Sequence, residues 1–285
     1  MRARNSRSTV HPPQDPTWAN YLARFHRERP GITERILSRC HAGRLDPYEW
    51  CAQPLGGQPG PILDVACGSG PMADQLGGWI GADTSAAELD AAHDRRRFPL
   101  LRASATRLPI RGAALDAAVC SMGMQIIDPV ADALAELARV LRPGGRVVLL
   151  LPAAGPIPWR QAVTFVRLQV ALGRRIRYPN DDILRPTALP RATAAVGLQV
   201  THDERLAFRL PLDTGAQAGE LLASFYLPEV GPGRLAAGRR VLAGRIGSAL
   251  TVPLRRIVLD REPGNGVGRR RVPTTFAHPT DGGQP

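Results

Sequence analysis

The sequence contains no lysine, so arginine supplies all 37 of its basic residues, against 25 acidic ones. Without lysine, the Tyr–Lys proton relay of many nicotinamide-dependent reductases cannot form. The formal net charge of +12 would by itself favour a nucleic-acid partner. However, the arginines at positions 2, 4, 7 and 269–271 fall in segments that resemble tails. We therefore interpret the excess mainly as solvated charge, and RNA stays the second hypothesis for a partner.

Cysteines and long apolar runs are also scarce. The four cysteines, Cys40, Cys51, Cys67 and Cys120, include no CxxC pair and no histidine at metal-ligand spacing, so we expect reduced thiols and no metal site. No apolar run reaches 18 residues, and the N-terminal residues lack the apolar stretch of a signal peptide. These absences predict a soluble, cytoplasmic protein.

Composition divides the chain into four segments. Residues 1–15 and 263–285 are rich in Arg, Pro, Gly, Ser and Thr without apolar periodicity, which predicts disordered tails. Residues 16–57 carry apolar residues at helical spacing and predict three short helices on the lid or substrate side. Residues 58–262 form the main predicted domain. Its helical insertions are expected near 153–185 and 214–247.

Apolar runs alternate with helical patterns along the main segment, as a parallel sheet requires. Strands are expected at 61–66, 78–83, 99–103, 115–121, 145–152, within 198–210 and at 252–259. Helices are expected at 130–141, 157–174, 183–196 and within 214–247, with a turn at 143–145. The last strand mixes polar and apolar residues, as is typical of a sheet edge. We predict an α/β fold: a doubly wound, mostly parallel, seven-stranded Rossmann-like sheet with added N-terminal and lid helices.

The run from Pro61 to Met72 reads as a buried strand, a glycine turn and a helix start. Such a turn brings bare backbone close to a ligand. Gly68, Gly70 and Ala73 satisfy the loose GxGxxG/A pattern of dinucleotide-binding proteins. Asp64 weighs against a dinucleotide, because a carboxylate facing the same turn would repel a pyrophosphate and attract an ammonium group. S-adenosylmethionine carries an ammonium and a sulfonium at this end.

A second acid, Asp83, ends the second predicted strand 19 residues after Asp64. An acid in this position can accept both ribose hydroxyls of a nucleoside. An aspartate after a strand is more often a helix cap, but Thr84 and Ser85 can serve as the cap here. We therefore favour the ribose role for Asp83.

The order of these segments resembles the class I S-adenosylmethionine-dependent methyltransferases, in particular the small-molecule branch called methyltransferase type 11. The motifs that carry the resemblance are DVACGSG at 64–70, GAD at 81–83, LP at 108–109, LDAAVCSMGMQIID at 115–128 and LRPGGRVVLL at 141–150. The resemblance implies S-adenosylmethionine as the cofactor. The cofactor-binding residues that it implies are Asp64, Ala66, Cys67, Gly68, Gly70, Asp83, Thr84, Ser104, Ala105 and Ser121.

One motif departs from the family pattern. Where the family usually has Gly-Asp/Glu-Ala after the third strand, this chain has Ala103-Ser104-Ala105. Ser104 can make one hydrogen bond to adenine but lacks the charge. A donor-binding protein without turnover therefore stays open beside the two enzyme hypotheses, a small-molecule methyltransferase and an RNA methyltransferase.

Methyl transfer from a sulfonium is an in-line displacement, and positioning accounts for much of the catalysis. A general base is needed only when the acceptor must lose a proton. His26, His41, His93 and His202 are the candidates, but none lies in a recognisable motif, so no catalytic residue is assigned.

The acceptor site is expected outside the nucleotide half of the sheet. Trp159, Phe165, Phe225 and Tyr226 would suit a lid over an apolar or aromatic acceptor, although such aromatics usually belong to a core. Arginines 174, 175 and 177 could meet an acidic substrate, but a solvated helix end is the simpler interpretation.

Overall fold

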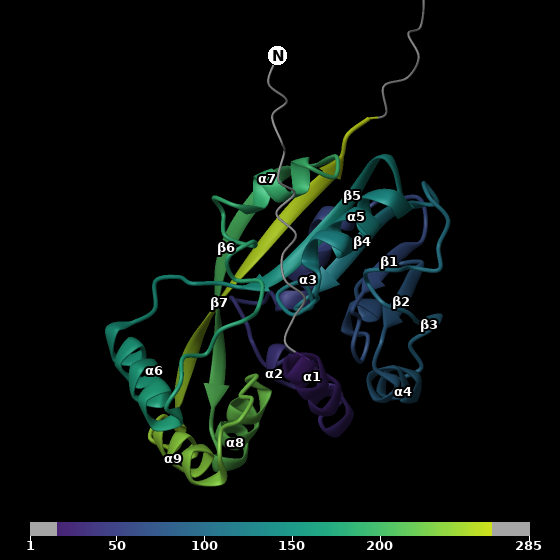
Figure 1. The fold of residues 1–285 in the computed structure, drawn as a ribbon. Helices are drawn as coiled ribbons and strands as arrows, with labels where there is room; N and C mark the ends of the chain where they lie inside the picture. Colours follow the sequence, from purple (N-terminus) through teal and green to yellow (C-terminus); the bar gives the residue numbers. More distant parts are fainter. Residues whose placement is uncertain (1–15, 264–285) are drawn as a thin grey trace, which may run out of the picture.

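A twisted seven-stranded sheet organises the chain in the computed structural model, which describes residues 16–263 (Figure 1). The strand order is β3-β2-β1-β4-β5-β7-β6. The first five strands pair in parallel, and β7 is antiparallel to both β5 and β6. This Rossmann-like, mostly parallel arrangement confirms the predicted fold class. The strands are β1 (Ile62–Val65), β2 (Trp79–Asp83), β3 (Leu100–Arg102), β4 (Leu115–Ser121), β5 (Leu141–Pro152), β6 (Leu198–Leu212) and β7 (Ser248–Arg261).

Helices cover both faces of the sheet. The α-helices are α1 (Pro16–Glu28), α2 (Ile32–Leu37), α3 (Pro47–Ala52), α4 (Ala86–Asp94), α5 (Val130–Val140), α6 (Trp159–Leu172), α7 (Leu189–Ala194), α8 (Gly215–Ser224) and α9 (Pro232–Ala243). Two 3-10 helices, η1 (Gln53–Leu55) and η2 (Pro71–Asp74), complete the described elements. The predicted N-terminal helices are thus α1, α2 and α3. The predicted tails lie outside the described residues, apart from residue 263.

Alternate residues of the central strands pack into two separate hydrophobic cores. Val119 and Val148 belong to one buried cluster, with residues of α2, α3, α6 and α8. Their neighbours Ala118, Cys120 and Leu149 belong to the other, with residues of α5 and α7. Successive side chains of a strand point to opposite faces, so apolar residues at every position require a sheet that is covered on both sides.

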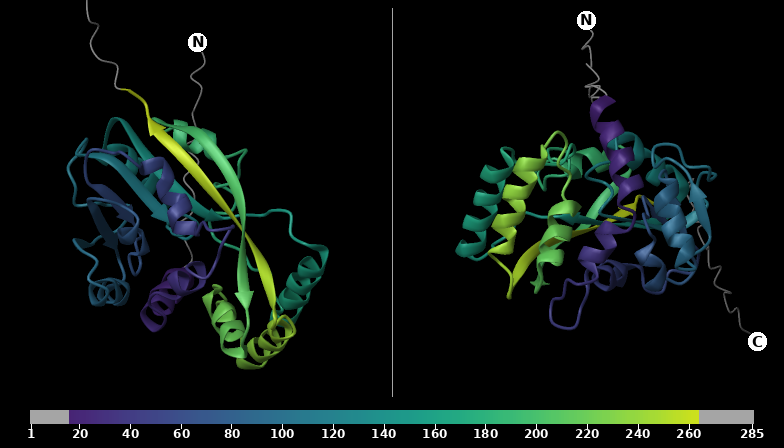
Figure 2. Two further views of the ribbon diagram at one scale, coloured as in Figure 1. Left: turned by 180° about the vertical axis from the view of Figure 1, so that it is seen from behind. Right: turned by 90° about the horizontal axis from the view of Figure 1, so that it is seen from below.

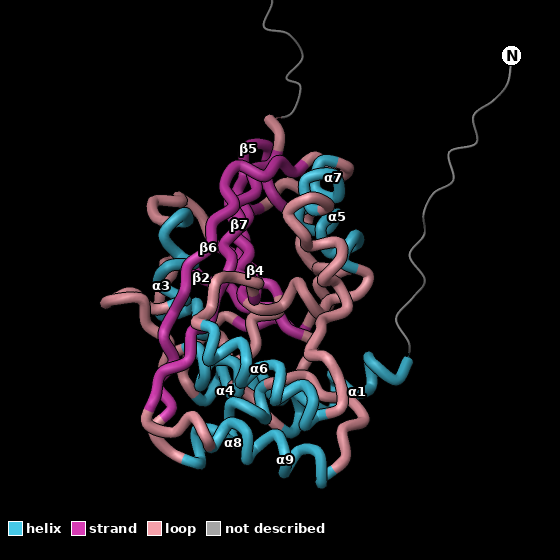
Figure 3. Tube along the Cα trace, turned by 90° about the vertical axis from the view of Figure 1, so that its left-hand side faces the viewer, coloured by secondary structure: helices cyan, strands magenta, loops and turns pink. Residues whose placement is uncertain are grey.

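The last two strands extend beyond the rest of the sheet as a long antiparallel ribbon. Helices α6, α8 and α9 gather at its far end, as the two additional views in Figure 2 and the turned view in Figure 3 show. Helices α1 and α2 lie between this group and the half that contains β1–β3 and α4 (Figures 1 and 2). The N-terminal helices therefore border both halves of the molecule.

One local prediction near the end of a strand was wrong. The helix expected after Gly70 is only the 3-10 turn η2, because eight residues separate Gly70 from Trp79 and leave no room for an α-helix with its connections. The turn expected at 143–145 lies within β5, where the pairing register with β4 shifts between Leu115 and Ala117. Helix α5 does end before this turn, as predicted.

Two predicted helical segments are interrupted. Of the helix expected at 183–196, only α7 forms, after a series of turns that includes Pro186. The segment 214–247 forms two helices, α8 and α9, separated by a loop that contains Pro228. Proline has no backbone N–H to donate and fixes its own backbone angle, so it interrupts helices at such points.

The expectation that the last strand forms a sheet edge was also wrong, because β7 lies between β5 and β6. Its polar residues are paired rather than solvated. Arg255 Nε donates to Asp203 at 2.6 Å, and Arg256 Nη2 donates to Glu204 at 2.7 Å. Both acids lie on β6, so ion pairs within the ribbon neutralise arginines that are almost fully buried.

Within residues 16–263, no helix combines the length and the apolar character that crossing a bilayer requires. The same residues contain no group of three or more His, Cys, Asp or Glu side chains placed to hold a metal ion.

Candidate functional site

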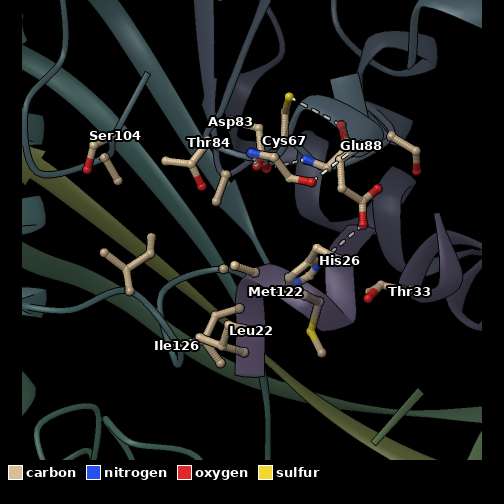
Figure 4. A pocket seen from close by; sticks show the side chains of 18 of the residues that line it. Leu22, His26, Thr33, Cys67, Asp83, Thr84, Glu88, Ser104, Met122 and Ile126 are labelled. Atoms are coloured by element: carbon tan, nitrogen blue, oxygen red, sulfur yellow. Dashed lines mark hydrogen bonds and ion pairs between the residues drawn. The ribbon is translucent and has the colours of Figure 1, made fainter. Parts of the chain in front are cut away.

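A cavity of about 750 Å³ opens at the carboxyl ends of β1, β2, β3 and β4. It lies where the strand order reverses between β1 and β4, the usual ligand position in an open α/β sheet. Helix α1 and the start of α2 cover it from the other side. Figure 4 shows side chains from these helices and from the ends of the strands facing the same space. Of the predicted cofactor residues, this cavity is lined by Ala66, Cys67, Gly68, Asp83, Thr84, Ser104, Ala105 and Ser121.

The turn after β1 has a backbone that favours glycine. Ala66, Gly68 and Gly70 all have positive φ angles, of 56°, 56° and 74°. The Gly68 N–H donates to Asp83 Oδ2 at 2.9 Å, which ties the turn to the end of β2. Gly70 does not line the cavity, and a Cβ added there would meet the Trp79 ring at 3.0 Å. Gly68 therefore shapes the cavity wall, whereas Gly70 permits close packing behind it.

Asp83 is placed to receive hydroxyl groups. Its Oδ2 accepts the Gly68 N–H and its Oδ1 accepts the Ser85 N–H at 2.8 Å. A carboxylate has about four acceptor sites, so two backbone donors leave acceptor capacity on the cavity side. Burial raises the pKa of this carboxyl, and the two backbone hydrogen bonds oppose that rise. Asp83 can thus accept the two adjacent hydroxyls of a ribose.

Asp64, the acid expected to face the ligand, does not line the cavity. Its side chain is 1% exposed, and its Oδ2 accepts the indole N–H of Trp79 at 3.0 Å. Its Oδ1 has no hydrogen-bond partner among residues 16–263. Burial raises the pKa of Asp64 to about 8, with smaller opposing effects from Trp79, which lowers it, and Asp83, which raises it. Burial therefore disfavours the charged form of Asp64, and its side chain does not face the cavity.

Polar groups also line the cavity at the ends of β3 and β4. The Ser104 hydroxyl lies 2.8 Å from the Thr106 hydroxyl and accepts the Thr106 N–H at 3.2 Å. The Ser121 hydroxyl is buried without a hydrogen-bond partner in the part of the chain that the structure describes. A ligand in this cavity could therefore pair with Ser121 at little cost, since an unpaired buried hydroxyl is unfavourable.

A chain of hydrogen bonds on the opposite wall could not be predicted from any motif. Glu88, on α4, accepts the Gly31 N–H at 2.8 Å with Oε2, and its Oε1 lies 3.0 Å from His26 Nδ1. His26 Nε2 lies 3.2 Å from the Tyr226 hydroxyl. The spacing Ser85-x-x-Glu88 resembles a capping box, and Ser85 does cap α4, but the Glu88 carboxylate turns toward α1 and α2 (Figure 4).

A second group of polar contacts attaches α2 to the glycine turn. The Ser69 hydroxyl donates to Glu34 at 2.6 Å, and Arg97 donates to Glu34 at 2.8 Å and to the Ser69 carbonyl at 2.8 Å. Arg97 also pairs with Asp74. These contacts, like those of Glu88, join the N-terminal helices to the sheet, so the cavity has a closed wall on that side.

A second cavity, of about 650 Å³, lies toward the β6–β7 ribbon and helices α6 and α8. It shares three lining residues with the first cavity: Thr33, Met122 and Tyr226. Most of its other lining residues are apolar, including Ile36, Leu168, Leu210, Leu221 and Leu254. The two cavities are therefore adjacent, with Tyr226 and Met122 at their common border.

The other candidates, which are aromatic residues, histidines and arginines, differ in whether they line a cavity. Phe165, Phe225 and Tyr226 line the second cavity, whereas Trp159 is 70% exposed and lines neither. Among the histidines, His26 lines the first cavity, and the other three are exposed and line neither cavity: His41, His93 and His202. The arginines at 174, 175 and 177 also lie outside both linings, and Arg174 donates to the Pro228 carbonyl.

Comparisons with known proteins agree with this architecture. Residues 63–149 match the family model described as a methyltransferase domain. A demethylmenaquinone methyltransferase of Mycobacterium sp. (strain KMS) is 41% identical over 127 residues, which are 42% of this chain and 54% of that protein. One from Deinococcus radiodurans is 36% identical over 118 residues, covering 36% and 49%. The chain thus spans about half the length of these curated relatives.

Among solved structures, the YcgJ protein from Bacillus subtilis aligns with a TM-score of 0.51 at 14% identity. The alignment covers 76% of this chain and 97% of that chain. At this level of identity the match supports the fold alone.

Proposed function

We propose that this chain, whose residues 63–149 match the model of a methyltransferase domain, transfers the methyl group of S-adenosylmethionine to a small-molecule acceptor. The observation that carries the proposal is the position of Asp83. Its carboxylate lies on the cavity at the end of β2, fixed by the N–H groups of Gly68 and Ser85. This arrangement suits a nucleoside whose ribose meets the acid while the adjacent turn borders the amino-acid end.

The residues of the cavity fit this donor. A volume of about 750 Å³ lies within the range of small-molecule and cofactor sites. We assign the ribose to Asp83, the adenine to Ser104 and Ala105, and the sulfonium end to Ser121, whose buried hydroxyl lacks a partner among the described residues. When bound, the donor supplies a methyl group on a positively charged sulfur. The chain's own part is to bind it, orient it and exclude water with α1 and α2.

The second cavity supports a small apolar acceptor rather than RNA. Its lining is mostly apolar, and it meets the first cavity at Met122 and Tyr226. The matching relatives are named for demethylmenaquinone, a small apolar molecule. Their name therefore agrees with a small apolar acceptor here.

The test uses S-adenosylmethionine labelled with tritium in its methyl group, incubated with the full chain and a cell extract. The extract is then divided into organic-soluble, RNA and protein fractions. We expect the label in the organic-soluble fraction, and less of it with Asp83→Ala. Label confined to RNA would overturn the assignment of a small-molecule acceptor.

A further inference from the structure

We propose that Tyr226, His26 and Glu88 form a proton relay that deprotonates a hydroxyl group on an apolar acceptor held in the second cavity. The inference deepens the proposed function and rests on it, since the methyl donor must occupy the first cavity. It makes the reaction an O-methyl transfer to a phenol-like substrate.

The geometry of the three side chains is that of a relay. His26 Nδ1 lies 3.0 Å from Glu88 Oε1, and a carboxylate can only accept there, so we assign the imidazole proton to Nδ1. Nε2 is then an acceptor, and the Tyr226 hydroxyl at 3.2 Å donates to it. The other Glu88 oxygen is held by the Gly31 N–H at 2.8 Å, which fixes the carboxylate.

The relay lies where donor and acceptor would meet. Tyr226 lines both cavities, whereas His26 lines only the first. Tyr226 is buried, and its ring packs against Phe25, with 4.6 Å between the ring centroids. The Tyr226 side chain is therefore held at the border of the two cavities by packing as well as by its hydrogen bond to His26.

The second cavity selects the class of acceptor. Side chains such as Ile36, Phe165 and Leu221 offer apolar contact, which favours an aromatic or aliphatic body. At the border with the first cavity, the Tyr226 hydroxyl can accept one hydrogen bond while it donates to His26. A hydroxyl group on the acceptor is the donor that fits this site.

The transfer balances without another reactant. The acceptor oxygen forms a bond to the methyl carbon as the carbon–sulfur bond breaks, and the electron pair of that bond stays on sulfur. The acceptor proton passes to the Tyr226 oxygen while the Tyr226 proton passes to His26 Nε2. The imidazolium is stabilised by Glu88, and it can release the proton to solvent because the His26 side chain is 22% exposed. Tyr226 touches the substrate, and Glu88 is a positioning residue.

The relay requires a neutral imidazole at His26 as the acceptor of the Tyr226 proton. The charged and titratable groups around His26 are Glu88 on α4, Asp83 at the end of β2 and the Tyr226 hydroxyl. Tyr178 and Tyr21 lie near Tyr226 in turn. Burial raises the pKa of Tyr226 well above its ordinary value, so this phenol stays neutral and can donate to His26 across the assayed range.

The experiment uses the full chain with 7-hydroxycoumarin and 1-naphthol as apolar phenol probes. Binding of S-adenosylhomocysteine is measured first by calorimetry, followed by methyl transfer from tritium-labelled S-adenosylmethionine to each probe as a function of pH. The variants are Tyr226→Phe and Glu88→Gln. The matched control is Tyr21→Phe, which removes a hydroxyl that accepts the N–H of Leu227, the residue after Tyr226.

We expect Tyr226→Phe and Glu88→Gln to lower kcat by about 100-fold or more, the usual contribution of general acid–base catalysis. KM and the affinity for S-adenosylhomocysteine should change by less than roughly threefold, about 0.6 kcal/mol. Tyr21→Phe should keep both the rate and the pH profile of the wild type.

Three results would overturn the relay. The first is a Tyr226→Phe variant as fast as the wild type, and the second is a Glu88→Gln variant that keeps the kcat of the wild type, which decides the matter if Tyr226→Phe does not fold. The third is a wild type that binds S-adenosylhomocysteine but neither binds nor methylates either phenol. A wild type that fails to bind S-adenosylhomocysteine overturns the proposed function instead, so the two failures are distinguishable.

Discussion

Asp64 should make the stability of this chain fall as pH rises, and Asp64→Asn should remove that contribution. Burial raises the pKa of this carboxyl to about 8, against 3.8 for an ordinary aspartate. The folded chain therefore keeps a proton on Asp64 that the unfolded chain releases. Since the native state binds more protons between these two values, the free energy of unfolding decreases from about pH 4 to about pH 8.

The magnitude follows from the width of this window. Each pH unit within it lowers the free energy of unfolding by about 1.4 kcal/mol, so the wild type should lose roughly 2–3 kcal/mol between pH 5 and pH 7 relative to Asp64→Asn. The asparagine oxygen can still accept the Trp79 N–H. Urea denaturation of both proteins across this range measures the difference, with Asp90→Asn on the exposed side of α4 as the control. A difference between wild type and Asp64→Asn that does not change with pH would refute the protonated state.

Three further predictions concern the donor cavity and its surroundings. Asp83→Ala should weaken binding of S-adenosylmethionine by about 1–3 kcal/mol, the cost of a lost charged hydrogen-bond partner, and calorimetry showing no change in a folded variant would exclude Asp83 from the site. Gly81→Ala should destabilise the fold by about 1–3 kcal/mol, because its Cβ would lie 2.4 Å from the Trp79 ring. Gly233→Ala, where a Cβ meets nothing within 4 Å, is the control in thermal denaturation. Arg97→Met should loosen α2 from the turn and raise the Kd for S-adenosylhomocysteine several-fold. An unaltered Kd would show that these contacts of Arg97 do not contribute to donor binding.

The strands of the nucleotide half could be predicted because their signals are local. β1, β2 and β4 are short apolar runs next to glycine or acid residues, and no other element competes for them. β7 was harder to place, since a strand containing Arg255 and Arg256 resembles an exposed edge. Only the partner strand, with Asp203 and Glu204 opposite, explains how these arginines are buried.

The site residues also fall into those with a local sequence signal and those that only the fold brings together. The turn and Asp83 could be predicted because they lie within 20 residues of one another, in a recognisable strand-turn-strand order. Asp64 belongs to the same motif, but its side chain faces Trp79 rather than the cavity, and periodicity cannot give that orientation. His26 contacts Glu88 and Tyr226 across 62 and 200 residues of sequence, so the chain of hydrogen bonds appears only once the fold is known.

The central claim is that the cavity beside Asp83 binds the methyl donor, and calorimetric titration of the wild-type chain tests it most directly. The ligands are S-adenosylmethionine, S-adenosylhomocysteine and NADPH, each added separately at the same concentration. The account predicts saturable one-to-one binding of both methionine nucleosides and no heat of binding from NADPH. Binding of NADPH with neither nucleoside would contradict it.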